Sequence, residues 1–109
     1  MAKSRKKKLY QLKTEIIKAL GQPLRLEIVD ILSEKEMCVE EIANAVKAER
    51  SNVSRHLSVL SNAGLLQSRR EGLKAYYSLK IPCVLRFFGC VEEVLEEQLK
   101  ERLKLLGKE

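Results

Sequence analysis

The fold follows from one short stretch, Arg50-Ser51-Asn52-Val53-Ser54-Arg55-His56-Leu57. Val53, Leu57 and Leu60 recur at intervals of three and four residues, which predicts a helix with one buried stripe. The residues between them are polar or basic. The 21 residues from 50 to 70 contain no aspartate or glutamate, whereas acidic residues recur through most of the remaining chain. We therefore expect a positively charged surface on the exposed side of this helix.

A second short helix precedes this one and is joined to it by a tight turn. Its apolar stripe consists of Val39, Ile42, Ala43 and Val46. Cys38 stands at the N-cap position and Glu41 follows three residues later, which is the spacing of a capping box. The turn, Lys47-Ala48-Glu49, is about three residues long. The pair predicts a helix-turn-helix, a motif whose second helix enters the major groove of double-stranded DNA.

The segment after this pair favours strands and is basic. The second helix ends at Gly64, a residue that suits a left-handed C-cap. Residues 65–69 and 75–79 predict two strands joined by residues 70–74, where Gly72 supplies the positive φ of a hairpin. A basic hairpin that follows a helix-turn-helix directly predicts a wing.

Three further helices complete the chain, over residues 9–20, 23–32 and 83–106, as apolar residues at helical spacing indicate. The last would be about 35 Å long. A domain of this size does not bury such an apolar stripe alone. We therefore expect a mainly α fold, a winged helix-turn-helix in which four helices, a two-stranded β-hairpin and a fifth helix follow one another. The first and last helices would form a homodimer.

The net charge of +6 is concentrated in residues 1–8 and 50–80. We expect one domain over residues 9–106, preceded by a basic, disordered arm over residues 1–8. This arm would either aid solubility or contact DNA.

Other classes of protein are not expected. Lys13, Glu15 and Lys18 interrupt the apolar residues that a secretory signal would need, and no apolar run reaches membrane-spanning length. We expect a cytoplasmic, nucleoid-associated protein without membrane contact, whose three cysteines are thiols. An enzyme is not expected, because there is no glycine-rich phosphate loop and the single histidine, His56, lies on the DNA-facing helix.

Several segments, in order and at matching spacing, resemble the ArsR/SmtB family of winged-helix repressors. They are residues 19–25 (ALGQPLR), 37–43 (MCVEEIA), 53–57 (VSRHL) and 63–66 (AGLL), with 69–72 (RREG) and 76–79 (YYSL) similar to the wing. The resemblance covers roughly residues 9 to 95. It implies a homodimer that occupies a palindromic operator and leaves it when a metal ion, metalloid or oxidant binds.

The exposed face of the second helix and the hairpin would contact the DNA without a cofactor. Arg55 is the candidate for a guanine and Arg50 for a phosphate, while the wing would reach the flanking minor groove or backbone. For His56, the alternative is packing against the preceding helix, over residues 39–46, or a bond to a phosphate. The full set of expected contacts is Arg50, Ser51, Asn52, Ser54, Arg55, His56, Arg69, Arg70 and Lys74.

Three positions depart from the family pattern. Glu40 stands where metalloid-sensing members have the second cysteine of Cys-Val-Cys. The histidines that zinc-sensing members carry on the last helix are absent. Lys47 replaces a glycine in the turn before the DNA-reading helix, at a small cost in turn geometry.

The effector would bind, if anywhere, at Cys38, Cys83 and Cys90. Cys83 and Cys90 share a helix face but lie about 10 Å apart along its axis, so they would share an ion only across the dimer or with Cys38. Thiolates favour arsenite, antimonite or a soft divalent metal. Thiol oxidation or persulfidation, with Cys38 as the most reactive thiol, is one alternative. A winged-helix module that binds DNA or protein without a ligand is another, and the cysteines would then only pack.

Overall fold

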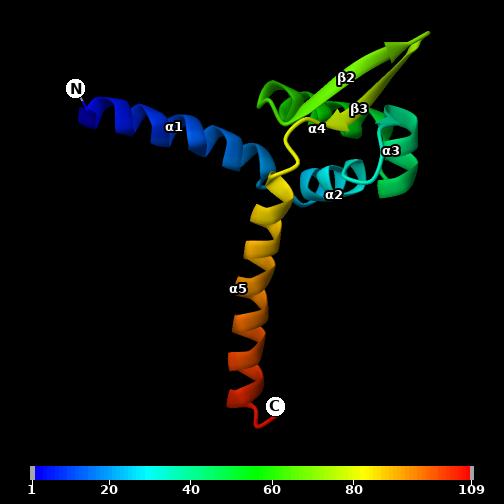
Figure 1. Ribbon diagram of the computed structural model, residues 1–109. Helices are drawn as coiled ribbons and strands as arrows, with labels where there is room; N and C mark the ends of the chain where they lie inside the picture. Colours follow the sequence, from blue (N-terminus) through cyan, green and yellow to red (C-terminus); the bar gives the residue numbers. More distant parts are fainter. Residues whose placement is uncertain (1, 109) are drawn as a thin grey trace.

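The computed structural model describes residues 2–108. Its elements are α1 (Ala2–Leu20), α2 (Pro23–Leu32), β1 (Met37–Cys38), α3 (Val39–Val46), α4 (Arg50–Asn62), β2 (Leu66–Glu71), β3 (Lys74–Leu79) and α5 (Val84–Leu105). Helices α2, α3 and α4 and the sheet form a body, from which α1 and α5 project in different directions (Figure 1). The predicted fold class, a mainly helical winged helix-turn-helix, is confirmed. No helix within residues 2–108 is long and apolar enough to cross a membrane.

The core of the body is built from the apolar stripes of α2, α3 and α4. Its most deeply buried large side chains are Ile28, Val29, Ile42, Val53, Leu57 and Leu60. The stripes predicted for the helix-turn-helix are therefore confirmed. The projecting helices are buried only where they join the body, at Ala19, Leu20 and Val84.

The sheet is antiparallel with the strand order β1-β3-β2. Strand β1 was not predicted, because two residues are too few to show an alternating pattern. The hairpin strands are longer than expected: Glu71 pairs with Lys74, so the turn is only Gly72 and Leu73 rather than residues 70–74. The opposite charges of Glu71 and Lys74 favour this cross-strand pair. Gly72 has the expected positive φ, 64°.

Two left-handed residues orient α4 within the body. At its end, Gly64 has φ 84°, and the N–H of Leu65 donates to the carbonyl of Leu60 at 3.0 Å, as in a Schellman motif. Before it, Lys47 ends α3 with φ 55° and ψ 50°. It is the only residue other than glycine with positive φ in residues 2–108. A side chain in this conformation costs about 1 kcal/mol, the strain expected for a lysine in place of glycine.

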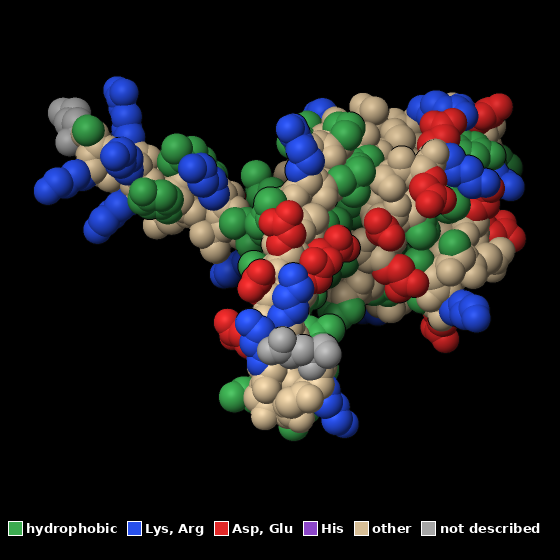
Figure 2. All heavy atoms as spheres, turned by 60° about the horizontal axis from the view of Figure 1, so that its bottom comes forward, with side chains coloured by type: hydrophobic (Ala, Val, Ile, Leu, Met, Phe, Trp, Pro, Cys, Tyr) green, Lys and Arg blue, Asp and Glu red, His purple; other side chains and the backbone are tan. Residues whose placement is uncertain are grey.

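The start of the chain differs from the expected disordered arm. Helix α1 continues back through residues 2–8, while Met1 lies outside the described residues. This segment holds alanine, lysine and arginine, which are strong helix formers, and neither glycine nor proline. Basic side chains surround the free end of the helix in Figure 2. The positive charge of the arm is thus carried on a helix.

Candidate nucleic-acid interface

The exposed face of α4 carries most of the residues predicted to contact DNA. Because its apolar stripe packs into the core, the helix turns outward the side chains of Arg50, Ser51, Ser54 and Arg55. Asn52 is half-buried beside them, and its Oδ1 accepts a hydrogen bond from Arg55 Nη2 at 3.3 Å. The structure therefore brings five of the predicted residues onto one polar, basic surface without a carboxylate on α4 itself.

His56 packs within the protein, as the alternative for it expected, but its hydrogen-bond partner lies on α2 rather than on α3. It is half-buried, and its Nδ1 accepts a hydrogen bond from Nε of Arg25 on α2 at 3.1 Å. Arg25 Nη1 also donates to the carbonyl of Ala19 at 3.1 Å, so one guanidinium joins the ends of α1 and α2 to α4. Burial, and then the charges of Arg25 and Arg55, lower the pKa of His56. A neutral His56 thus holds α4 against α2.

Arg69 is engaged by carboxylates rather than free on the wing. Its Nε donates to the two carboxylate oxygens of Glu36 at 3.0 and 3.1 Å, and its Nη2 forms an ion pair with the same group. Its Nη1 lies 2.9 Å from Oε2 of Glu71. These hydrogen bonds raise the pKa of Arg69, and the one from Arg69 lowers the pKa of Glu36. The predicted availability of Arg69 to DNA is therefore not what this arrangement favours.

The remaining basic residues of the wing are open to solvent. Arg70 and Lys74 are exposed and form no ion pair within residues 2–108. Because alternate residues of a strand point to opposite faces, Arg70 lies on the other face of β2 from Arg69. The wing thus presents two free cations and one paired one.

Arg25 and Glu36 bind two of the predicted site residues, His56 and Arg69, and the sequence did not reveal these contacts. Their partners are 31 and 33 residues away along the chain. Helical and strand periodicities report neighbours within a few positions, so no local pattern links these residues.

The cysteines are separated in the structure. Cys38 is buried, which does not favour its predicted role as the most reactive thiol. Its own N–H donates to the carboxylate of Glu41 at 3.0 Å, and the predicted capping box is confirmed. Cys83 and Cys90 are exposed. Within residues 2–108, no three side chains are grouped to hold a metal ion.

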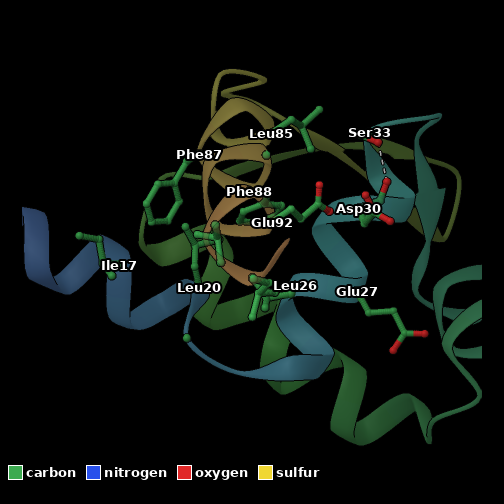
Figure 3. Close-up of a pocket in the computed structure, with 14 residues that line it drawn as sticks. Ile17, Leu20, Leu26, Glu27, Asp30, Ser33, Leu85, Phe87, Phe88 and Glu92 are labelled. Atoms are coloured by element: carbon green, nitrogen blue, oxygen red, sulfur yellow. Dashed lines mark hydrogen bonds between the residues drawn. The ribbon is translucent and has the colours of Figure 1, made fainter. Parts of the chain in front are cut away.

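An apolar groove lies where α1, α2 and α5 meet. Its cavity volume is about 710 Å³. Figure 3 shows Leu20, Leu26 and Phe88 at its centre, with the carboxylates of Asp30 and Glu92 close by. Beyond the groove, apolar side chains continue along both projecting helices in contact with solvent; they include Leu9, Leu12, Ile16, Ile17, Val91, Val94, Leu95 and Leu99. This surface has the composition of an interface rather than of an exterior.

The sequence matches known proteins over the helix-turn-helix and beyond. Residues 22–68 match the family model described as "Bacterial regulatory protein, arsR family". An uncharacterized HTH-type transcriptional regulator of Mycobacterium tuberculosis is 35% identical over 90% of this chain and 87% of its own length. A protein of Synechocystis named as a transcriptional repressor SmtB homolog is 36% identical over 76% of this chain and 63% of its own.

A solved structure also aligns with the chain. It is the homodimeric winged helix-turn-helix DNA-binding domain of a possible ArsR-family transcriptional regulator from Mycobacterium bovis. It has a TM-score of 0.76 and 36% identity, and the match covers 89% of this chain and 90% of that one.

Proposed function

The chain belongs to the arsR family of bacterial regulatory proteins, a family of DNA-binding transcriptional regulators and not of enzymes; from this premise we propose that it is a homodimeric repressor of a palindromic operator. The observation that carries the proposal is the outward face of α4. Two arginines and several short polar side chains are exposed there, and the helix itself contains no carboxylate. Such a face fits the major groove, whose base edges offer hydrogen-bond acceptors and donors.

The proposed contacts divide by position. Arg55, near the middle of α4, reads a base edge, and Asn52 supports its side chain through their hydrogen bond. Arg50, in the first turn, binds a phosphate. Arg70 and Lys74 hold the backbone beside the groove from the wing. Phosphate contacts supply affinity and base contacts supply sequence preference.

A second copy of the chain is the proposed cover for α1 and α5. Leu95 and Leu99 on α5 are each 58% exposed and belong to a contiguous apolar stripe, the kind of surface that marks an interaction site. The middle of α5 is also complementary in charge to α1: α1 carries seven basic residues and one acidic one, whereas residues 92–97 of α5 hold four glutamates and no basic residue. A homodimer also appears in the similar solved structure. Its twofold axis would place two copies of α4 in successive major grooves, about 34 Å apart.

The effector proposed for release is a soft metal ion or a metalloid bound by Cys83 and Cys90 of two copies. Both thiols are exposed, and both flank the apolar stripe of α5 that the dimer would bury. A site shared between copies would couple ligand binding to the angle between the protomers, and hence to the spacing of the two α4 helices. Oxidation of the same thiols would act on the same element.

The proposal is tested by fluorescence anisotropy on the DNA upstream of the protein's own gene. We expect tighter binding to this DNA than to a shuffled sequence of equal length, and two protomers per site. Titration of the complex with arsenite, cadmium or diamide should release the DNA, and a Cys83→Ser, Cys90→Ser variant should resist release. Equal affinity for both DNAs would refute operator recognition, whereas release of the variant by arsenite would refute only the thiol site.

A further inference from the structure

We propose that Glu36 competes with DNA phosphate for Arg69, so that a carboxylate of the protein holds one arginine of the wing out of the DNA interface and limits affinity. The inference rests on the proposed function, since it concerns how the wing meets DNA. Its starting point is that the most extensively bonded arginine of the wing is bonded only to carboxylates.

Glu36 occupies one particular edge of the Arg69 guanidinium. Glu36 accepts from Nε and Nη2 of Arg69, whereas Glu71 accepts from Nη1. The Nε–Nη2 edge is a fork of parallel donors that binds a carboxylate or a phosphate in a bidentate manner. Glu36 therefore takes the place that a DNA phosphate would take, while the contact with Glu71 would leave that edge open.

The position of Arg69 in the sheet places it across one strand from Glu36. Glu36 comes directly before β1, and Arg69 lies on β2, so their ion pair crosses the central strand β3. Tyr76 of β3 lies under the guanidinium, with its ring centroid 5.0 Å from the central carbon of Arg69. This stacking would keep the guanidinium oriented whether its fork holds a carboxylate or a phosphate.

The ion pair between Arg69 and Glu36 is open to exchange with a phosphate. The side chains of Arg69 and Glu36 are 51% and 39% exposed, so water and a phosphate group both have access to the pair. Exposed ion pairs are weak because water and salt screen them. A DNA phosphate could therefore replace the carboxylate of Glu36 as the partner of Arg69.

The consequence is measurable as a change in salt dependence. Arg69 with two carboxylates forms a group with a net negative charge beside Arg70 and Lys74. Removing the charge of Glu36 frees the fork of Arg69 for one additional phosphate contact. Each such contact steepens the plot of log affinity against log salt by about 0.9 and contributes about threefold in affinity across a fourfold change in salt.

The test compares Glu36→Gln with Glu34→Gln in anisotropy titrations on the upstream DNA at several salt concentrations. Glu34 lies in the turn after α2, two residues away, and forms no ion pair within residues 2–108, so its variant removes the same charge nearby. We expect the slope for Glu36→Gln to be steeper by about 0.9, so that its advantage over the wild type grows about threefold when the salt concentration is lowered fourfold. Glu34→Gln should show no change in slope.

The same titrations in an Arg69→Gln background separate a freed arginine from a general change in charge. The gain from Glu36→Gln should vanish there. A gain of equal size without Arg69, or weaker binding by Glu36→Gln together with a lowered melting temperature, would overturn the competition and leave Glu36 as a simple brace of the wing. If the wild-type protein prefers its upstream DNA and Glu36→Gln behaves like wild type, only this inference fails. If the wild type shows no such preference, the proposed function fails and this inference with it.

Discussion

The body and the two projecting helices use the same kind of residue in opposite ways. In the body, Ile28, Ile42 and Leu57 are at most 1% exposed and meet one another across three helices. On α5, Leu95 and Leu99 recur at the same helical spacing but are 58% exposed. The comparison teaches that periodic apolar residues specify a face to be covered, without specifying whether the same chain or a second copy covers it.

Within residues 2–108, side-chain hydrogen bonds join α1 to the body through Arg25. Arg25 bonds to the carbonyl at the end of α1 and to His56 on α4, so the helix proposed for dimerisation and the helix proposed for DNA reading share one side chain. Arg25 therefore fixes the end of α1 relative to α4.

The largest expected effect comes from breaking the apolar stripe of α5. Leu95→Glu should leave the body folded, because this side chain is already more than half exposed, but it should separate the protomers. Affinity for a palindromic site should then fall by about 10²- to 10⁴-fold, because the second half-site no longer binds as part of the same molecule. Sedimentation velocity and anisotropy measure the two losses. Lys100→Gln makes the same change in charge on the other side of α5, and an equal loss there would contradict the assignment of the stripe.

The next effect concerns the outward face of the body. Arg55→Gln should cost about 1 to 3 kcal/mol on the operator and should relax preference at one base pair. Lys74→Gln should instead weaken binding to all sequences alike, as expected for a phosphate contact. Anisotropy with operator and random DNA checks both variants. Equal losses of Arg55→Gln on the two DNAs would show that Arg55 does not read a base.

A smaller effect sharpens the account of the turn that positions α4. Lys47→Gly should raise the free energy of unfolding by about 0.5 to 1 kcal/mol, since glycine adopts the left-handed conformation without a clash but loses more entropy on folding. Lys47→Ala keeps the side-chain penalty and should give no such gain. Urea unfolding of the three proteins measures the difference, and equal stability of the glycine and alanine variants would mean that φ 55° is not strained here.

The smallest expected effect tests the contact that joins the two regions. Because the pKa of His56 is lowered in the folded protein, the unfolded chain binds more protons as the pH falls through its ordinary value of 6.5. The contribution of His56 to the free energy of unfolding should therefore be complete above pH 6.5. It should decrease as the pH falls toward the lowered, folded-state pKa. His56→Gln keeps an acceptor for Arg25 and should lose this dependence between pH 7.5 and 5.5. His56 is the only histidine, so a variant that retains the full dependence would assign it to other groups.

Much of the fold was predictable because its signals are local. The stripes of α3 and α4, the left-handed Gly64 and the hairpin turn at Gly72 each depend on residues within a few positions of one another. The elements that were not predicted were either too short or too uniformly basic to show a periodic pattern. Strand β1 has two residues, and the extension of α1 has lysines and arginines on all sides.

The candidate site was predictable only in part, for the same physical reason. The outward position of Arg50 and Arg55 follows from the buried stripe on the opposite side of α4. The pairing of Arg69 and the engagement of His56 depend on residues 33 and 31 positions away. Periodicity predicts the side of the backbone on which such a side chain lies, but it does not predict which charged group from a distant segment lies beside it.

The sequence by itself determined that five helical segments and a basic hairpin form a winged helix-turn-helix with basic residues on and beside α4. The tertiary structure alone decided which of those cations are free, that Cys38 is buried, and that the apolar faces of α1 and α5 remain uncovered within one chain. Helix and turn formation depend on short-range sterics and spacing. Burial and charge pairing depend on which distant segments the packed core brings together, and that is settled only when the whole chain folds.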